Sequence, residues 1–89
     1  MKNVISYAYY ETEQSKYNLN FFSKVGIIES NDTLYIIVIN GEVCSIDLPK
    51  YNNCVILKRP NIGFDFGAHN HSLEYIKEKG LQFDYYIFL

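Results

Sequence analysis

The strongest constraint on the fold is a run of apolar residues from Thr33 to Ile39, which ends at Asn40-Gly41. A strand that is apolar at successive positions has to be covered on both of its faces. Strands of this kind occur in parallel sheets that have helices packed on either side. The run therefore predicts a buried strand in a sheet of the α/β class.

Three other short segments are rich in β-branched and aromatic residues, as strands are. They are Val4 to Tyr10, Cys54 to Leu57 and Tyr85 to Leu89. One alternative stays open, because Asn40-Gly41 also suits a tight type I′ turn. In that case Glu42 to Ile46 would return as an antiparallel strand, whereas we expect the sheet to be mainly parallel.

Two segments between these strands have apolar residues at helical spacing. The first predicted helix starts at Tyr17 and is followed by Gly26, at the position of a left-handed cap. The second contains Leu73 and Ile76 and is closed by Gly80. We expect its first turn to hold Glu74 and its last turn to hold Lys77 and Lys79. Charges placed in this way complement the helix dipole.

The order of these elements is strand, helix, strand, strand, helix, strand, with short connections. This order predicts a Rossmann-like α/β fold, with a mainly parallel sheet flanked by helices. The chain has 89 residues, enough for a single domain spanning 1–89. Its 48% hydrophobic and 20% charged residues exclude a disordered tether.

Net charge and the cysteines narrow the function classes further. Eight basic and ten acidic residues give a net charge of −2 without a run of like charge, so the chain lacks the basic surface of a nucleic-acid or anionic-membrane binder. Cys44 and Cys54 are too few for a disulfide framework and too far apart for a paired zinc motif. The chain shows neither a signal peptide nor about 18 consecutive apolar residues. We expect a cytoplasmic protein without a membrane span and with free thiols.

The residues that follow the third predicted strand carry the clearest chemistry. Ligands of parallel sheets bind beyond the carboxyl ends of the strands. Arg59 stands there as the only arginine beside seven lysines, and its rigid fork of donors suits a phosphate or a carboxylate. Gly63 and Gly67 permit close approach of the backbone to a ligand. Asp65 would accept hydrogen bonds from sugar hydroxyls or from a base amide, or would cap the next helix.

Simpler interpretations stand beside these. Two glycines four residues apart are common in ordinary loops, and Glu11 after the first strand would equally be a solvated surface charge. His69 and His71 alternate as a metal pair would, but no third ligand follows at a suitable spacing. Cys44 has no identifiable base that would make it a nucleophile.

The segment Arg59 to Ala68, followed by a helix and then by Phe83 to Leu89, resembles the first half of a GT-A-fold glycosyltransferase. The resemblance is to the rhamnan-synthesis type and to related viral and bacterial glycosyltransferase-like proteins. Ser6 to Glu11 and Leu19 to Phe22 resemble the opening strand and helix of the family, so the likeness covers essentially the whole chain.

This resemblance implies a nucleotide-diphospho-sugar as the ligand. It implies that base and ribose are lined by four residues, namely Tyr7, Ala8, Glu11 and Asn40. It also implies that Arg59 faces the diphosphate in a pocket shaped by Asn61, Gly63, Asp65 and Gly67. Family members normally carry two acidic residues at the end of the second strand, where this chain has Asn40-Gly41.

By the same resemblance, a complete family domain holds Mn²⁺ or Mg²⁺ through an Asp motif that follows the strand matching Tyr85 to Leu89. This chain ends at Leu89, so we expect it to encode no metal site and no catalytic residue. We therefore expect an incomplete domain, from a truncated product, a fragment or a split gene, that binds a nucleotide-sugar but is inactive alone. The alternative is a non-catalytic interaction module whose exposed last strand pairs with a second polypeptide or with another copy.

Overall fold

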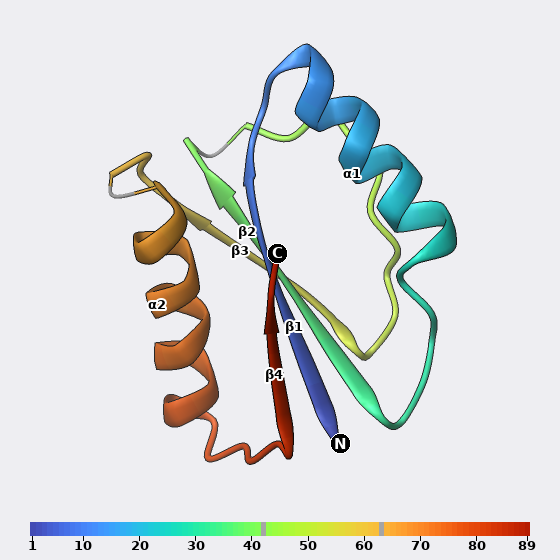
Figure 1. Cartoon of the computed structure of the whole chain (residues 1–89), viewed down its shortest axis with the longest axis vertical. Helices are drawn as coiled ribbons and strands as arrows, with labels where there is room; N and C mark the ends of the chain where they lie inside the picture. Colours follow the sequence, from blue (N-terminus) through green and yellow to red (C-terminus); the bar gives the residue numbers. More distant parts are fainter. Residues whose placement is uncertain (42, 63) are drawn as a thin grey trace.

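The fold is a four-stranded parallel sheet with one helix on each face (Figure 1). The computed structural model describes residues 1–41, 43–62 and 64–89, with Phe64 and Asp65 described by their backbone alone. The sheet has the order β3-β2-β1-β4, and each neighbouring pair is parallel. The predicted Rossmann-like α/β fold is confirmed. Its elements are β1 (Asn3–Tyr10), α1 (Glu13–Val25), β2 (Thr33–Asn40), β3 (Cys54–Arg59), α2 (Phe64–Glu78) and β4 (Tyr85–Phe88).

β2 is buried on both faces, as its apolar run predicts. Alternate side chains of the strand enter two separate cores. Leu34, Ile36 and Val38 pack on the α2 side, while the intervening residues pack on the α1 side with Leu19. Burying an Ile side chain fully contributes roughly 1.5–3 kcal/mol. The strand is therefore the main source of hydrophobic stabilisation in the sheet.

α1 begins four residues before the predicted start at Tyr17. Thr12 caps it: the Ser15 amide donates to Thr12 Oγ1 at 3.1 Å, and the Thr12 amide donates to Ser15 Oγ at 2.7 Å. At the other end, Gly26 has φ −100°, so the predicted left-handed cap is wrong. Glycine is needed there for space, because a Cβ would overlap the ring of Phe22.

α2 also begins earlier than predicted, at Phe64, so Glu74 lies well inside the helix and not in its first turn. Its end agrees with the prediction. Gly80 has φ +66°, its amide donates to the carbonyl oxygen of Lys77, and the Leu81 amide donates to that of Ile76. In the part of the chain that the structure describes, no helix combines the length and the apolar character needed to cross a membrane.

The antiparallel hairpin after Asn40-Gly41 is wrong. β3 runs parallel to β2, and residues 43–53 form an irregular segment that contains no strand. Its apolar side chains pack on the α1-side core instead, and these are Cys44, Ile46 and Leu48. The segment thus takes the place of a helix on that face and returns the chain to the amino end of the sheet.

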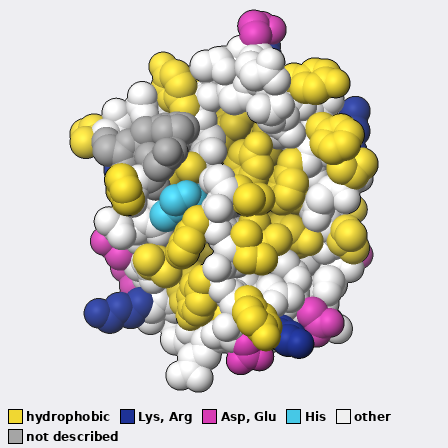
Figure 2. All heavy atoms as spheres, viewed as in Figure 1, with side chains coloured by type: hydrophobic (Ala, Val, Ile, Leu, Met, Phe, Trp, Pro, Cys, Tyr) yellow, Lys and Arg dark blue, Asp and Glu magenta, His cyan; other side chains and the backbone are white. Residues whose placement is uncertain are grey.

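β4 lies at the edge of the sheet and is exposed along its whole length. Its four residues are 43–59% exposed, and among the described residues it pairs with β1 alone. Leu89 extends this pairing, because its amide donates to the Ser6 carbonyl and its carbonyl accepts from the Ala8 amide. Figure 1 shows β4 in front of the other strands. In the same view, Figure 2 shows a broad area of apolar side chains between the positions of the two helices.

Candidate functional site

The carboxyl ends of β1 and β2 and the loop after β3 enclose a cavity of about 320 Å³. We call it the carboxyl-edge cavity. Three of the predicted site residues lie in its wall, Glu11, Asn40 and Asn61, although they come from three separate parts of the chain. The other lining residues are Tyr10, Gly41 and Val43. The parallel sheet brings these residues together because all of its strands end at the same edge.

Arg59 is not among the residues that line this cavity, but its side chain is hydrogen-bonded to Asn40, which does line it. Its Nη1 donates to Asn40 Oδ1 at 2.7 Å, and its Nη2 donates to the carbonyl oxygen of Ile62 at 2.6 Å. Both acceptors are neutral. Among the described side chains no carboxylate forms an ion pair with Arg59, since the ion pair found there joins Glu13 and Lys16. Among the described side chains, the guanidinium is therefore held by neutral acceptors and meets no counter-charge.

Gly67 of α2 makes room for this guanidinium. A Cβ at Gly67 would lie 2.5 Å from Arg59 Nη2 and 2.7 Å from the carbonyl oxygen of Ile62. Both distances are far below van der Waals contact, so a side chain here would displace the arginine. The group that closely approaches the helix backbone at Gly67 is the Arg59 side chain, whereas the prediction placed a ligand there.

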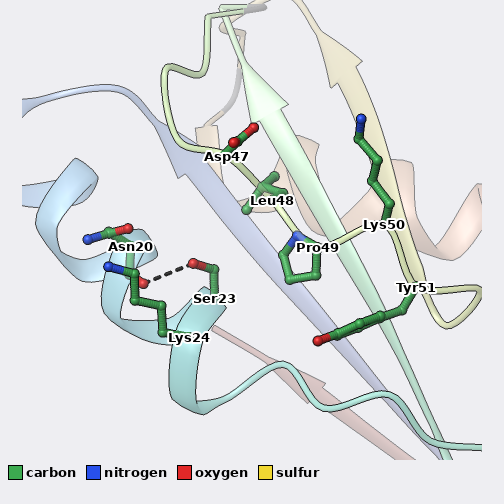
Figure 3. A pocket seen from close by; sticks show the side chains of 8 residues that line it. All are labelled: Asn20, Ser23, Lys24, Asp47, Leu48, Pro49, Lys50 and Tyr51. Atoms are coloured by element: carbon green, nitrogen blue, oxygen red, sulfur yellow. Dashed lines mark hydrogen bonds between the residues drawn. The ribbon is translucent and has the colours of Figure 1, made fainter.

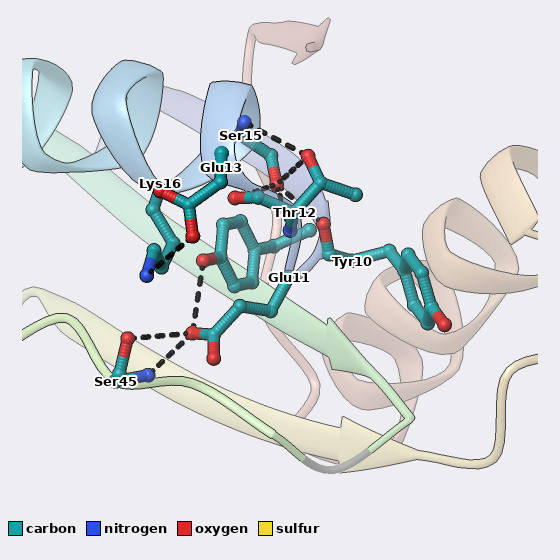
Figure 4. Close-up of polar contacts among 8 residues, drawn as sticks. Tyr10, Glu11, Thr12, Glu13, Ser15, Lys16 and Ser45 are labelled. Carbon is teal, nitrogen blue, oxygen red and sulfur yellow. Dashed lines mark hydrogen bonds and ion pairs between the residues drawn. The ribbon is translucent and has the colours of Figure 1, made fainter.

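Glu11 is a surface carboxylate that is held by hydrogen bonds from two other residues. Its Oε1 accepts from the Ser45 amide at 2.6 Å, from Ser45 Oγ at 2.9 Å and from the Tyr9 hydroxyl at 3.2 Å (Figure 4). The hydrogen bond from the Ser45 backbone is the main reason that the pKa of Glu11 is lowered. Glu11 therefore ties the end of β1 to the segment after β2 as a carboxylate.

The neighbouring Tyr9 was not predicted as part of this arrangement. Burial, followed by the hydrogen bond to Glu11, raises the pKa of Tyr9 to about 12. No local pattern links Glu11 to Ser45, which lies 34 residues further along the chain. Tyr10, by contrast, is the last residue of β1, and its place at the carboxyl edge could have indicated a cavity residue.

Tyr7 and Ala8 do not line the cavity, because they lie further back in β1, opposite Ile37 and Val38. The Tyr7 ring stacks on Phe22 of α1, with centroids 4.9 Å apart, and burial raises its pKa. Ala8 packs on the other face of the sheet, with the α2-side core. Two further predictions cannot be placed: Gly63 and the side chain of Asp65 lie outside the described residues, although the backbone of Asp65 belongs to the first turn of α2.

The two histidines are turned to different surroundings. His69 Nδ1 lies 2.8 Å from Ser6 Oγ, and the His69 ring packs on Phe88 with centroids 4.9 Å apart. His71 lines a separate hollow of about 170 Å³ beside Glu74. Within the described ranges, no three His, Cys, Asp or Glu residues are grouped as metal ligands.

Cys44 and Cys54 are free thiols, and burial raises the pKa of both. Cys44 Sγ donates to the carbonyl oxygen of Ile46 at 3.7 Å. A raised pKa disfavours the thiolate, which is the nucleophilic form. The structure therefore gives no support to a Cys44 nucleophile.

A larger hollow, of about 610 Å³, lies between α1 and residues 47–51 (Figure 3). It contains none of the predicted site residues. Its partly buried hydroxyl, Ser23 Oγ, already donates to the carbonyl oxygen of Asn20, and Lys24 and Lys50 lie on opposite sides of the hollow. The carboxyl-edge cavity is therefore the better candidate for a ligand site.

Comparison of the chain with protein-family models, with curated proteins and with solved structures found no match.

Proposed function

We propose that this chain is the nucleotide-sugar-binding portion of a glycosyltransferase, with the carboxyl-edge cavity and Arg59 as the binding site for a nucleotide-diphospho-sugar. The observation that carries the proposal is the Arg59 guanidinium, fixed beside this cavity by the neutral acceptors Asn40 and Ile62. A positioned cation that meets no counter-charge among the described residues attracts an anion. The sugar acceptor of the complete enzyme would be a glycan or a protein.

The chemistry of the cavity suits both ends of such a ligand. Arginine has five N–H donors, so Arg59 keeps donors for a diphosphate beyond the two bonds described above. Glu11 Oε1 takes three hydrogen bonds, while Oε2 accepts none from the described residues and is left for a ribose hydroxyl. The volume of about 320 Å³ falls at the lower end of the roughly 300–1,000 Å³ of small-molecule sites.

We propose that the residues described here contribute the binding of the donor, and that transfer of the sugar needs a divalent cation as well. In the family that it resembles, Mn²⁺ or Mg²⁺ stabilises the leaving diphosphate, a contribution of several kcal/mol in such chemistry. By that resemblance, the residues for the cation would follow the strand that matches Tyr85 to Leu89. The free thiols fit a reducing compartment, so we propose the cytoplasm as the location.

The test is a calorimetric titration with UDP, GDP and dTDP, each with and without Mn²⁺ or Mg²⁺. We expect saturable binding of at least one of them and a loss of roughly 10- to 100-fold in Arg59→Ala, the range for hydrogen bonds to a charged group. Lys58→Ala is the matched control, because Lys58 adjoins Arg59 in β3 but lines a different hollow. The proposal fails if none of the nucleotides binds, or if folded Arg59→Ala binds as tightly as the unmodified chain.

The exposed β4 supports a second candidate, an interaction module that pairs two copies of the chain along this strand. β4 has apolar side chains at all four positions and no charge or proline to discourage pairing. We would then expect stable dimers at micromolar concentration in light scattering, lost in Ile87→Lys. A monomer over that concentration range would exclude this candidate and leave the nucleotide titration unaffected.

A further inference from the structure

We infer that Asn40 is a positioning residue that keeps the charge of Arg59 available to a ligand anion. The inference deepens the proposed function, on which it rests, by naming the residue that makes the site specific for an anionic group. It also explains why a neutral amide ends β2.

The amide of Asn40 holds a neighbouring group through its oxygen and another through its nitrogen. The residue has no exposed surface. Its Oδ1 accepts from Arg59 Nη1 at 2.7 Å, while its Nδ2 donates to the carbonyl oxygen of Tyr9 at 3.1 Å. The side chain therefore joins the end of β1 to the end of β3 and orients the guanidinium. Because the residue has no exposed surface, Asn40 has little to offer a ligand directly.

The consequence follows from charge. A carboxylate of the same shape at residue 40 would also accept from Arg59, but it would form a partly buried ion pair and neutralise the guanidinium. An amide makes the same hydrogen bond without adding a charge. The neutral carbonyl of Ile62 does the same on Nη2. Among the described residues, the acceptors that orient Arg59 are thus neutral, which is the arrangement that favours an external anion.

The experiment measures binding of inorganic pyrophosphate to the full chain and to two variants that add the same single negative charge. Asn40→Asp places it on Arg59. Asn52→Asp places it on an exposed residue ahead of β3, at the opposite end of the strand. We expect Asn40→Asp to lose about tenfold or more in affinity, the effect of one charged hydrogen bond, and Asn52→Asp to change it by less than about twofold. The salt dependence should also become shallower in Asn40→Asp, a change that a packing defect would not cause.

Equal affinity of the unmodified chain and folded Asn40→Asp would overturn the inference, and so would equal losses in both Asp variants. If Asn40→Asp does not fold, Gly67→Ala tests the same orientation without a new charge, because its Cβ would displace Arg59. Unchanged pyrophosphate binding by folded Gly67→Ala would then overturn the inference. If the unmodified chain binds neither pyrophosphate nor any of the nucleotides, the proposed function fails. If the unmodified chain binds pyrophosphate and folded Asn40→Asp binds it equally well, the inference about Asn40 fails while the proposed function stands.

Discussion

Ser6 Oγ of β1 lies 2.8 Å from His69 Nδ1 of α2, in a contact that joins residues 63 positions apart. The same oxygen lies 2.7 Å from Ser72 Oγ, and both serines are almost completely buried. We predict that Ser6→Ala lowers the free energy of unfolding by about 1–3 kcal/mol, because it removes the serine partner of a buried hydroxyl. Urea denaturation measures this change.

A double-mutant cycle with Ser72→Ala isolates the contact between the two hydroxyls. We expect the double variant to lose less stability than the sum of the single losses, since no buried hydroxyl of this pair is then left unmatched. Strict additivity would show that the two serines do not stabilise one another.

Asn53 connects three segments at the amino end of the sheet. Its Nδ2 donates to the carbonyl oxygens of Ile28 at 2.8 Å and Thr33 at 2.9 Å, and only 2% of the residue is exposed. We predict that Asn53→Ala costs about 1–3 kcal/mol of stability, because it leaves two partly buried hydrogen bonds without their donor. Asn52→Ala, at the exposed neighbouring position, should change urea stability by less than about 0.5 kcal/mol. Equal losses in the two variants would contradict the role of Asn53.

Glu11 should make the stability of the fold depend on acid pH. Its pKa lies below the ordinary value of 4.5 because of the Ser45 hydrogen bonds, so its contribution is present above pH 4.5 and is lost as the pH falls through the lowered value. Glu11→Gln removes the charge. We therefore expect the unmodified chain to melt at a higher temperature than Glu11→Gln at pH 7, and this difference to shrink towards pH 3.

Glu13→Gln is the control for this pH dependence. Glu13 is exposed, and among the described residues it forms its ion pair with Lys16 on the surface of α1, where ion pairs contribute little. Its substitution should leave the melting temperature nearly unchanged at both pH values. A difference between the unmodified chain and Glu11→Gln that is the same at pH 7 and pH 3 would refute the role assigned to the Glu11 carboxylate.

Gly26 and Gly80 should resist alanine for different reasons. At Gly26 the backbone is ordinary, but a Cβ would overlap the Phe22 ring, which is held by stacking on Tyr7. At Gly80 nothing lies within 4 Å of a Cβ, but φ is +66°. We predict losses of about 1–3 kcal/mol for Gly26→Ala, as in overpacked sites, and about 1 kcal/mol for Gly80→Ala. Chemical denaturation measures both, and a stabilised Gly26→Ala would show that the ring can move aside.

The strands were predictable because their signal is local. The apolar run of β2 follows directly from burial on both faces. The helix starts were missed because the first turns of α1 and α2 carry little apolar periodicity. Thr12 and Ser15 form a capping box with serine in the place of the usual Glu or Gln, so the pattern did not stand out. At α2, Gly67 and the polar residues after it concealed a helix that packs through Ala68 and Ile76.

The candidate site was predictable only in part, because its contacts join distant segments. The place of Arg59 at the carboxyl end of β3 could be predicted, and it indicated the edge of the sheet at which the residue lies. The orientation of the Arg59 side chain depends on Asn40, which is 19 residues away. The lowered pKa of Glu11 depends on Ser45, which is 34 residues away. Tyr7 shows a different limit of the prediction. A residue three positions before the end of a strand does not line the cavity at the carboxyl edge of the sheet.

The position of β1 in the sheet has a consequence for the order of assembly during synthesis. β1 is made first and lies between β2 and β4, so one of its neighbours is translated only after residue 84. Until then, one side of this strand has unpaired amide and carbonyl groups. The sheet should therefore be completed only after β4 has been translated. Before that point, a chaperone or a ribosome-bound factor would meet β1 with one edge unpaired.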